Sequence, residues 1–224
     1  MKKNIAHIIT LTSLCLAVLS IIQSCYFNFK ISAYLILISL VLDGIDGSIA
    51  RYLNTSSSFG KQLDSLSDMI AFGLAPAILL YNFLGHELNN YTLPYLTLLI
   101  PICSAVRLAN YNNDSVSENF HGLTTPASAL IFISIPLIHE YENNTYVLNI
   151  FMNESLIAGL IIVISVLLIS PLKTFNLRID TLKHDKRKLF FIFISICVLY
   201  LFNFTGLPLI ILIYILLSVK KLIK

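Results

Sequence analysis

Four aspartates lie inside apolar stretches of this sequence, where ionised side chains are rare. They are Asp43, Asp46, Asp64 and Asp68. A carboxylate near the centre of a bilayer costs about 2.5–3.5 kcal/mol on insertion scales, so four in mutual repulsion would cost on the order of 10 kcal/mol. Because one Asn or Ser would join two helices at a lower cost, we expect a cation among these carboxylates.

The spacing of the four aspartates indicates how they meet. Asp43 and Asp46 are three residues apart and Asp64 and Asp68 are four apart, so each pair shares one face of a helix. The short polar turn 54–58 joins the two helices, which makes them antiparallel neighbours whose acidic faces can meet. Oxygen ligands without His or Cys nearby favour Mg²⁺ or Mn²⁺ over zinc. We therefore predict that all four carboxylates ligate two divalent ions, an arrangement suited to phosphoryl-type displacement.

Small residues accompany both acidic pairs. Gly47 and Ala50 continue the helix face of Asp43, and Gly60 lies one turn before the second pair. Such residues let a backbone or a bulky ligand approach closely. Asp43 precedes Arg51 by eight residues, which places it about 12 Å below the cytoplasmic edge of the membrane. The residues alone thus predict metal-assisted phosphoryl chemistry near the headgroups of the cytoplasmic face.

The composition indicates that helices inside a membrane position these residues. Of 224 residues, 57% are hydrophobic and only 12% are charged, and the mean hydropathy is +0.82. An ordinary soluble domain has about a quarter of its residues charged, so a soluble globule, a disordered chain and a nucleic-acid-binding domain are excluded. We predict an all-α polytopic membrane helix bundle forming a single domain over 1–224. Residues 1–140 would form its catalytic core and 141–224 additional transmembrane helices. The four scattered cysteines are expected to be thiols of the core.

Apolar runs separated by polar clusters predict eight transmembrane helices. With the amino terminus in the cytoplasm, all but one of the 15 Lys and Arg residues fall in cytoplasmic segments, the exception being Lys30. Both chain termini are therefore expected in the cytoplasm. The first run is interpreted as a retained helix rather than a cleaved secretory signal, and the last two runs could instead form one re-entrant hairpin. The predicted ranges are 5–24, 31–52, 62–84, 92–111, 123–139, 155–172, 188–204 and 206–220.

The acidic residues and their neighbours form a longer motif that resembles a known family, the CDP-alcohol phosphatidyltransferases. Segments 67–77, 106–112 and 120–129 are similar to its bacterial and archaeal phosphatidylserine synthase branch. The resemblance covers about residues 5–130 by motif and the rest by topology. The motif reads Asp43-x-x-Asp46-Gly47-x-x-Ala50-Arg51, eight further residues, then Gly60-x-x-x-Asp64-x-x-x-Asp68.

The resemblance implies a reaction and roles for these residues. The phosphatidyl group of CDP-diacylglycerol would pass to the hydroxyl of L-serine, giving phosphatidylserine and CMP in the cytoplasmic membrane. Asp43, Asp46 and Asp64 would hold two Mg²⁺ or Mn²⁺ ions on the diphosphate, and Asp68 would complete the cluster and accept the proton of the alcohol. The resemblance also implies a homodimer in contact with membrane lipids. The residues expected to bind CDP-diacylglycerol are Asp43, Gly47, Ala50, Arg51 and Gly60.

The acceptor side of the site is defined less sharply by the sequence. Arg107, Asn112 and His121 are candidate contacts to the acceptor, although Arg107 equally fits an anchor at a helix end. The branch usually has Asn at the position of Ser13, Arg at that of Asn110 and Pro at that of Thr124.

The alternatives are another acceptor, such as glycerol 3-phosphate or an inositol phosphate, and an ion-coupled transporter. A phosphorylated acceptor should require more basic residues than Lys61 and Arg107, the two found between Arg51 and Gly122. Their scarcity favours a small zwitterion such as serine.

Overall fold

The computed structural model describes residues 2–53, 57–88, 91–113, 120–174 and 186–219, and the prediction of an all-α fold is confirmed over these residues. The only strands among them are β1 (Phe120–His121) and β2 (Lys173–Thr174). The helices are α1 (Lys2–Cys25), α2 (Phe29–Tyr52), α3 (Ser58–Asp68), the π-helical η1 (Met69–Leu74), α4 (Ala75–Glu87), the 3-10 helix η2 (Leu93–Leu98), α5 (Leu99–Asn113), α6 (Thr125–Tyr141), α7 (Thr145–Phe151), α8 (Glu154–Ile169), α10 (Lys186–Phe202), the 3-10 helix η3 (Asn203–Thr205) and α11 (Gly206–Val219).

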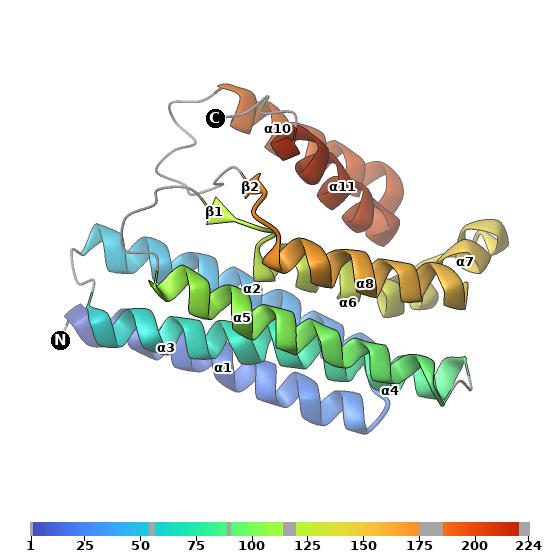
Figure 1. Ribbon diagram of the computed structural model, residues 1–224, viewed down its shortest axis with the longest axis horizontal. Helices are drawn as coiled ribbons and strands as arrows, with labels where there is room; N and C mark the ends of the chain where they lie inside the picture. Colours follow the sequence, from blue (N-terminus) through green and yellow to red (C-terminus); the bar gives the residue numbers. More distant parts are fainter. Residues whose placement is uncertain (1, 54–56, 89–90, 114–119, 175–185, 220–224) are drawn as a thin grey trace.

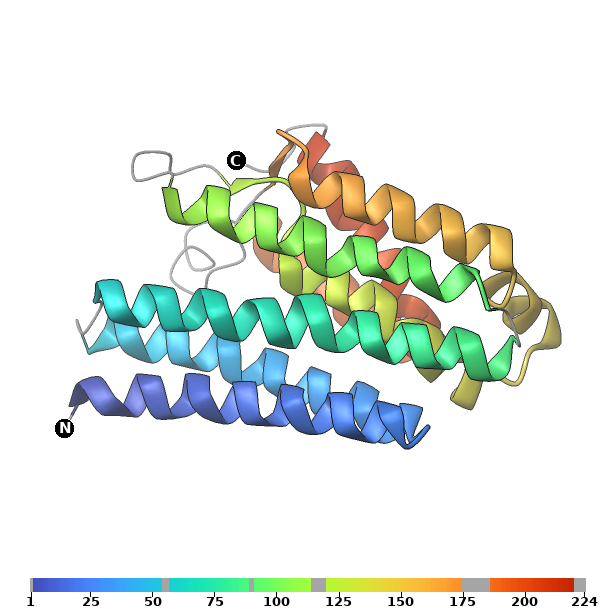
Figure 2. The same ribbon diagram turned by 60° about the horizontal axis from the view of Figure 1, so that its bottom comes forward.

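The long helices run along the same axis and alternate in direction (Figure 1). α3, η1 and α4 form one continuous helical segment, which packs against α1 and is followed by α5 on its other side (Figure 2). α6 lies inside the bundle, with almost every residue from Thr125 to Ile138 buried. It contacts α2 and α4 on one side and α8 and α11 on the other. α6 therefore joins the amino-terminal helices to α8 and α11.

Small residues form the contact between α1 and α2. Ser13 Oγ donates to the backbone oxygen of Ser39 (3.0 Å), and Ser39 Oγ donates back to the backbone oxygen of Ser13 (3.1 Å). Two turns further along α1, Ser20 Oγ donates to the backbone oxygen of Ser32 (2.9 Å). Ala17 is fully buried between these two serine pairs. Small side chains let membrane helices approach, and such hydrogen bonds hold them together. This serine seam, Ser13–Ser39 and Ser20–Ser32, fixes the register of α2 on α1.

Four helical segments are long and apolar enough to cross a membrane, judged by length and composition, and they support a multi-pass membrane protein. α7 and α8, bent by 53° at their junction, provide a fifth if they form one span. The predicted count of eight spans is not confirmed. The four segments are Ala6–Cys25, Ser58–Glu87, Leu93–Asn112 and Leu189–Ser218.

The last of these segments reverses direction at η3. The rings of Phe191 and Tyr214 lie 6.2 Å apart between centroids, although 23 residues separate them along the chain. At the turn, Asn203 has a positive φ of 48°, and a Cβ on Gly206 would lie 2.9 Å from the backbone oxygen of Val198. α10 and α11 are therefore the two arms of a helical hairpin.

Polar contacts mark the two ends of the bundle. At one end Lys30 Nζ lies 3.2 Å from Glu140 Oε1, which joins the start of α2 to the end of α6. At the other end β1 pairs antiparallel with β2. The alternating helices bring the start of α1, the end of α2 and the end of α5 to this second end (Figure 1). Lys2, Arg51 and Arg107 therefore belong to segments that share one end of the bundle.

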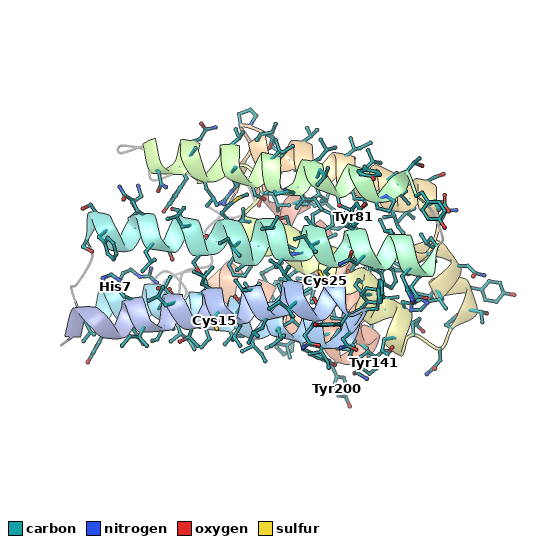
Figure 3. The ribbon with its side chains drawn as sticks, turned by 90° about the horizontal axis from the view of Figure 1, so that it is seen from below. His7, Cys15, Cys25, Tyr81, Tyr141 and Tyr200 are labelled. Carbon is teal, nitrogen blue, oxygen red and sulfur yellow. The ribbon has the colours of Figure 1, made fainter. Side chains whose placement is uncertain are left out.

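The prediction for the cysteines is wrong in part. All four are unpaired, but Cys15 and Cys25 are exposed on α1, and Cys103 and Cys197 are only half-buried (Figure 3 labels the first two). Lipid is as apolar as a protein core, so an apolar residue on a membrane helix need not face inward. Hydrophobic character alone therefore does not identify the core of this protein.

The seam between α1 and α2 should tolerate no larger side chain. Ala17→Leu adds three heavy atoms at a fully buried position, and overpacking of this kind costs about 1–3 kcal/mol. We expect the thermal unfolding midpoint of the purified protein in detergent to fall by several degrees. Val18→Leu on the exposed side of the same helix is the control and should leave the midpoint unchanged. Equal midpoints for both variants would contradict the packing described for this seam.

Candidate metal and substrate site

Three carboxylates meet between α2 and α3. One oxygen from each of Asp43, Asp64 and Asp68 lies within 4.8 Å of the other two, and all three side chains are half-buried. The short connection between the two helices makes them antiparallel, so the i and i+4 positions of α3 face the acidic side of α2. The structure thus brings together three of the four aspartates expected to ligate metal.

Asp46 is held separately from this group. Its side chain is 3% exposed, and its Oδ2 accepts a hydrogen bond from Thr10 Oγ1 of α1 at 2.5 Å. It remains near enough to Asp43 and Asp64 to repel both electrostatically. The fourth carboxylate therefore adjoins the three-residue group but has its own hydrogen-bonding partner.

The donor set fits a divalent cation. Oδ1 of Asp68 is buried and has no hydrogen-bond partner among the described residues. A buried polar atom without a partner is costly, and a cation bound by the three carboxylates would supply the missing interaction. Carboxylate oxygens are preferred ligands of Mg²⁺ and Mn²⁺. The residues present are thus those that such an ion requires.

A π-helical turn, η1, begins immediately after Asp68. Turns of this kind are rare and frequently occur at functional sites. Pro76 lacks a backbone N–H, so the carbonyl four residues earlier has no ordinary α-helical donor. Within η1, a Cβ on Gly73 would lie 3.1 Å from Ser104 Cβ, which shows how closely this turn passes α5. The wider turn lets α3 present its acidic face to α2 while α4 packs into the core.

The residues expected to bind CDP-diacylglycerol line the neighbouring end of α2 and α3. Arg51 is close enough to Asp46 and Asp64 to attract both electrostatically. A Cβ on Gly47 would lie 3.4 Å from Arg51 Nη1, an ordinary contact. Ala50 belongs to the same helix, and its side chain is outside the described part of the structure.

Gly60 lies against His7 of α1, near the end of the bundle where α1 and α3 begin (Figure 3). A Cβ at this position would lie only 2.9 Å from His7 Cε1 and 3.2 Å from Ser57 Oγ. Because Gly60 has no side chain, the His7 ring of α1 can pack directly against α3 at this position.

Arg107 approaches the carboxylates from α5. Its side chain is 8% exposed, and Nη1 donates to Thr125 Oγ1 of α6 at 3.2 Å. Its Nε is buried and has no hydrogen-bond partner in the described part of the chain. Arg107 attracts Asp68 electrostatically. A positive charge on α5 is therefore within electrostatic range of the carboxylate whose Oδ1 is also unpaired among the described residues.

The other two acceptor candidates differ in what the structure says of them. Asn112 Nδ2 donates to Ser65 Oγ (2.9 Å), and its backbone oxygen accepts from Lys61 Nζ (3.4 Å), so Asn112 is bound to α3 beside Asp64. His121 belongs to β1, and its side chain is outside the described residues. Arg107 is thus the one of the three whose charge acts on Asp68.

Sequence reasoning missed three features of the site. Thr10 and Thr125 were not recognised as partners of Asp46 and Arg107, because contacts between distant helices leave no local periodicity in the sequence. The π-helical turn was also missed, although Pro76 and Gly73 within an apolar run were its signal. Ser13, at a position where related sequences have Asn, bonds to Ser39 in the serine seam.

Comparison with known proteins identifies the class of protein. The sequence model of the CDP-alcohol phosphatidyltransferase family matches residues 3–168, past the core boundary predicted near residue 140. The chain belongs to this family, and it is a multi-pass membrane transferase of phospholipid biosynthesis.

Several relatives are named CDP-diacylglycerol–serine O-phosphatidyltransferase. The protein from Helicobacter pylori strain J99 is 33% identical over 179 residues, which cover 77% of this chain and 72% of the relative. The protein from Methanocaldococcus jannaschii is 39% identical over 112 residues (50% and 53%). The protein from Bacillus subtilis is 30% identical over 137 residues (59% and 75%).

Gly122 fixes the segment that leads into Thr125. It has a positive φ of 78°, its N–H donates to the backbone oxygen of Leu172 (2.8 Å), and a Cβ would lie 2.3 Å from the backbone oxygen of Leu168. Only glycine fits this conformation at low cost. The segment between β1 and α6 is therefore tied to the end of α8.

Gly122→Ala should displace this segment and with it the Thr125 partner of Arg107. We expect a lower unfolding midpoint and reduced transferase activity, because both the backbone conformation and the contact with Leu168 become unfavourable. Gly159→Ala in α8, where a Cβ meets nothing within 4 Å, is the matched control and should retain both. An unchanged midpoint for Gly122→Ala would show that this connection is not tight.

Proposed function

We propose that the protein transfers the phosphatidyl group of CDP-diacylglycerol to the hydroxyl of L-serine, releasing CMP and forming phosphatidylserine. The observation that carries this proposal is the group of Asp43, Asp64 and Asp68, with an unpaired buried oxygen on Asp68. The names of the relatives support serine as the acceptor. Two Mg²⁺ or Mn²⁺ ions would be held by these residues together with Asp46, and they would neutralise the diphosphate of the nucleotide lipid.

Asp68 is the proposed proton acceptor. The serine oxygen forms a bond to the phosphorus that carries the lipid, the bond from this phosphorus to the CMP oxygen breaks, and CMP leaves with that electron pair. The hydroxyl proton passes to the carboxylate of Asp68, at the oxygen that the ions do not engage. A carboxylate placed in this way serves as a general base. Gly47, Ala50, Arg51 and Gly60 would bind the nucleotide part of the substrate.

Arg107 is the proposed partner of the serine carboxylate. Its buried Nε has no hydrogen-bond partner among the described residues, and its charge attracts the carboxylate that would receive the serine proton. Lys61, the other basic residue in this part of the sequence, is engaged by the ring of Tyr111 at 5.3 Å and by the backbone oxygen of Asn112. One buried cation suits an acceptor with one carboxylate better than a phosphorylated one. Asn112 and His121 are proposed to complete the acceptor site.

The proposal includes the placement of the enzyme in the cell. It would cross the cytoplasmic membrane eight times as a homodimer in contact with membrane lipids, with both termini and the active site in the cytoplasm. Residues 1–140 would contain the catalytic core of a single membrane domain. This placement is supported by the basic residues predicted at one end of the bundle and by the acidic Glu140 and Glu142 at the other.

The acceptor can be identified by the release of CMP. Purified protein with CDP-diacylglycerol and Mn²⁺ or Mg²⁺ should release CMP with L-serine, because Arg107 can pair with a carboxylate. It should release little with glycerol 3-phosphate or an inositol phosphate offered in turn. Release with glycerol 3-phosphate alone would contradict serine as the acceptor and leave the reaction class intact.

Removal of the proposed base should abolish turnover. Asp68→Asn keeps the shape of the side chain but cannot take the proton, and loss of a general base costs about 10²–10⁴-fold in rate. CMP release should fall by this factor while the unfolding midpoint is retained or raised, since a buried charge is removed. Glu142→Gln at the opposite end of the bundle is the control. Near-normal turnover of Asp68→Asn would remove the role assigned to this residue.

A further inference from the structure

Thr10 belongs to α1, which carries none of the four aspartates, yet it contacts both helices that do. Its Oγ1 donates to Asp46 Oδ2 of α2 (2.5 Å) and also lies 3.0 Å from the backbone oxygen of Ala6. Its own backbone oxygen accepts from Ser67 Oγ of α3 at 3.3 Å, directly beside Asp68. One residue of α1 therefore connects the two acidic segments.

The contact with Asp46 is buried and short. Thr10 is 6% exposed and Asp46 is 3% exposed, so bulk water does not solvate this carboxylate freely. Hydrogen bonds from a hydroxyl to a carboxylate at about 2.5–2.7 Å are the strong, charge-assisted kind. Such a bond restricts the rotation of the carboxylate.

The bonding pattern of Thr10 differs from that of the serine seam on the same helix. Ser13 and Ser20 donate to backbone oxygens of α2, which joins the helices and involves no ionisable group. Thr10 donates instead to the side chain of an acid next to the three-carboxylate group. Its hydroxyl therefore acts on a functional side chain, in addition to any part it has in packing.

We propose that Thr10 is a positioning residue of the metal site, whose hydroxyl holds the Asp46 carboxylate ready to ligate a divalent cation. Its backbone oxygen, through Ser67, sets the position of α3 and hence of the segment that carries Asp68. This inference rests on the proposed function, since it requires that the aspartates bind ions. Residues that orient metal ligands typically contribute 10–100-fold to metal affinity.

The experiment measures ion binding directly, without substrate. The full-length protein in detergent is titrated with Mn²⁺, and free Mn²⁺ is followed by electron paramagnetic resonance. Thr10→Val keeps the branched shape and removes the hydroxyl, so Mn²⁺ affinity should fall about 10–100-fold. Thr10→Ser keeps the hydroxyl and should stay within about threefold of the unaltered protein, a rescue that packing alone would not produce. The Mn²⁺ concentration that half-saturates CMP release should rise in Thr10→Val and stay close to that of the unaltered protein in Thr10→Ser.

Two controls come from the same helix. Thr12→Val removes an exposed hydroxyl that bonds only to the backbone oxygen of Ile8 among the described contacts, and it should not change Mn²⁺ affinity. Ser13→Ala removes a buried hydroxyl of the serine seam and should lower the unfolding midpoint without a comparable loss of affinity. If Thr10→Val does not fold, Thr10→Ala replaces it, because Ala6 and Ala17 already occupy this side of α1.

The outcomes are distinct. Unchanged Mn²⁺ affinity in Thr10→Val, with binding by the unaltered protein, would overturn this inference and leave the proposed function standing. An equal loss of affinity in Ser13→Ala would also overturn it, because the effect would then come from helix packing. An unaltered protein that binds no Mn²⁺ would overturn both. A selective loss in Thr10→Val, restored in Thr10→Ser, would support the assignment.

Discussion

The constraint on which this structure depends is that like charges are brought together inside the bundle, where they are only partly hydrated. Carboxylates from α2 and α3 meet within 4.8 Å inside a bundle whose other buried side chains are almost all apolar or small. Their mutual repulsion and loss of hydration oppose folding unless positive charge enters the group. Arg107 supplies part of it from α5, and Arg51 supplies part from the end of α2. Under the proposed function divalent ions would supply the remainder, and metal binding would then be coupled to the stability of this part of the fold.

The packing of the helices around the acids also holds these residues in place, through contacts between small, uncharged residues. Paired serines and alanines bring α1 against α2, a glycine lets α1 approach α3, and the glycine of η1 lets α5 approach the long helix. Hydrophobic burial gives little net attraction between helices in lipid, so close packing and hydrogen bonds must take its place. These contacts fix the backbone positions to which the carboxylates are attached. The acidic residues are thus held by neighbours that are individually unremarkable in sequence.

The sequence predicted the features that depend on local spacing. Asp43, Asp64 and Asp68 meet because helical periodicity and a short turn leave them few other arrangements, and Gly60 allows the close approach expected of it. Features that depend on distant contacts were beyond such reasoning. The separation of Asp46 from the group follows from Thr10, 36 residues away, and the burial of Arg107 follows from Thr125 on another helix. The exposure of Cys15 shows a further limit of prediction from sequence. An apolar side chain on a membrane helix can face lipid as well as the protein core, so its hydrophobic character does not tell which.

The wide turn after Asp68 has a consequence for how the length of this region can vary. An α-helix rotates by about 100° per residue, whereas the segment Met69–Leu74 accommodates its residues in a broader coil. Because a π-helical turn takes in one residue more than an ordinary helical turn, deleting one residue there and forming an ordinary helix would leave the acids facing α2. The same deletion within α4, which is already an ordinary helix, would turn the acids by roughly 100° relative to the rest of α4. The wide turn is therefore the part of this helix whose length can change while the acids keep their direction.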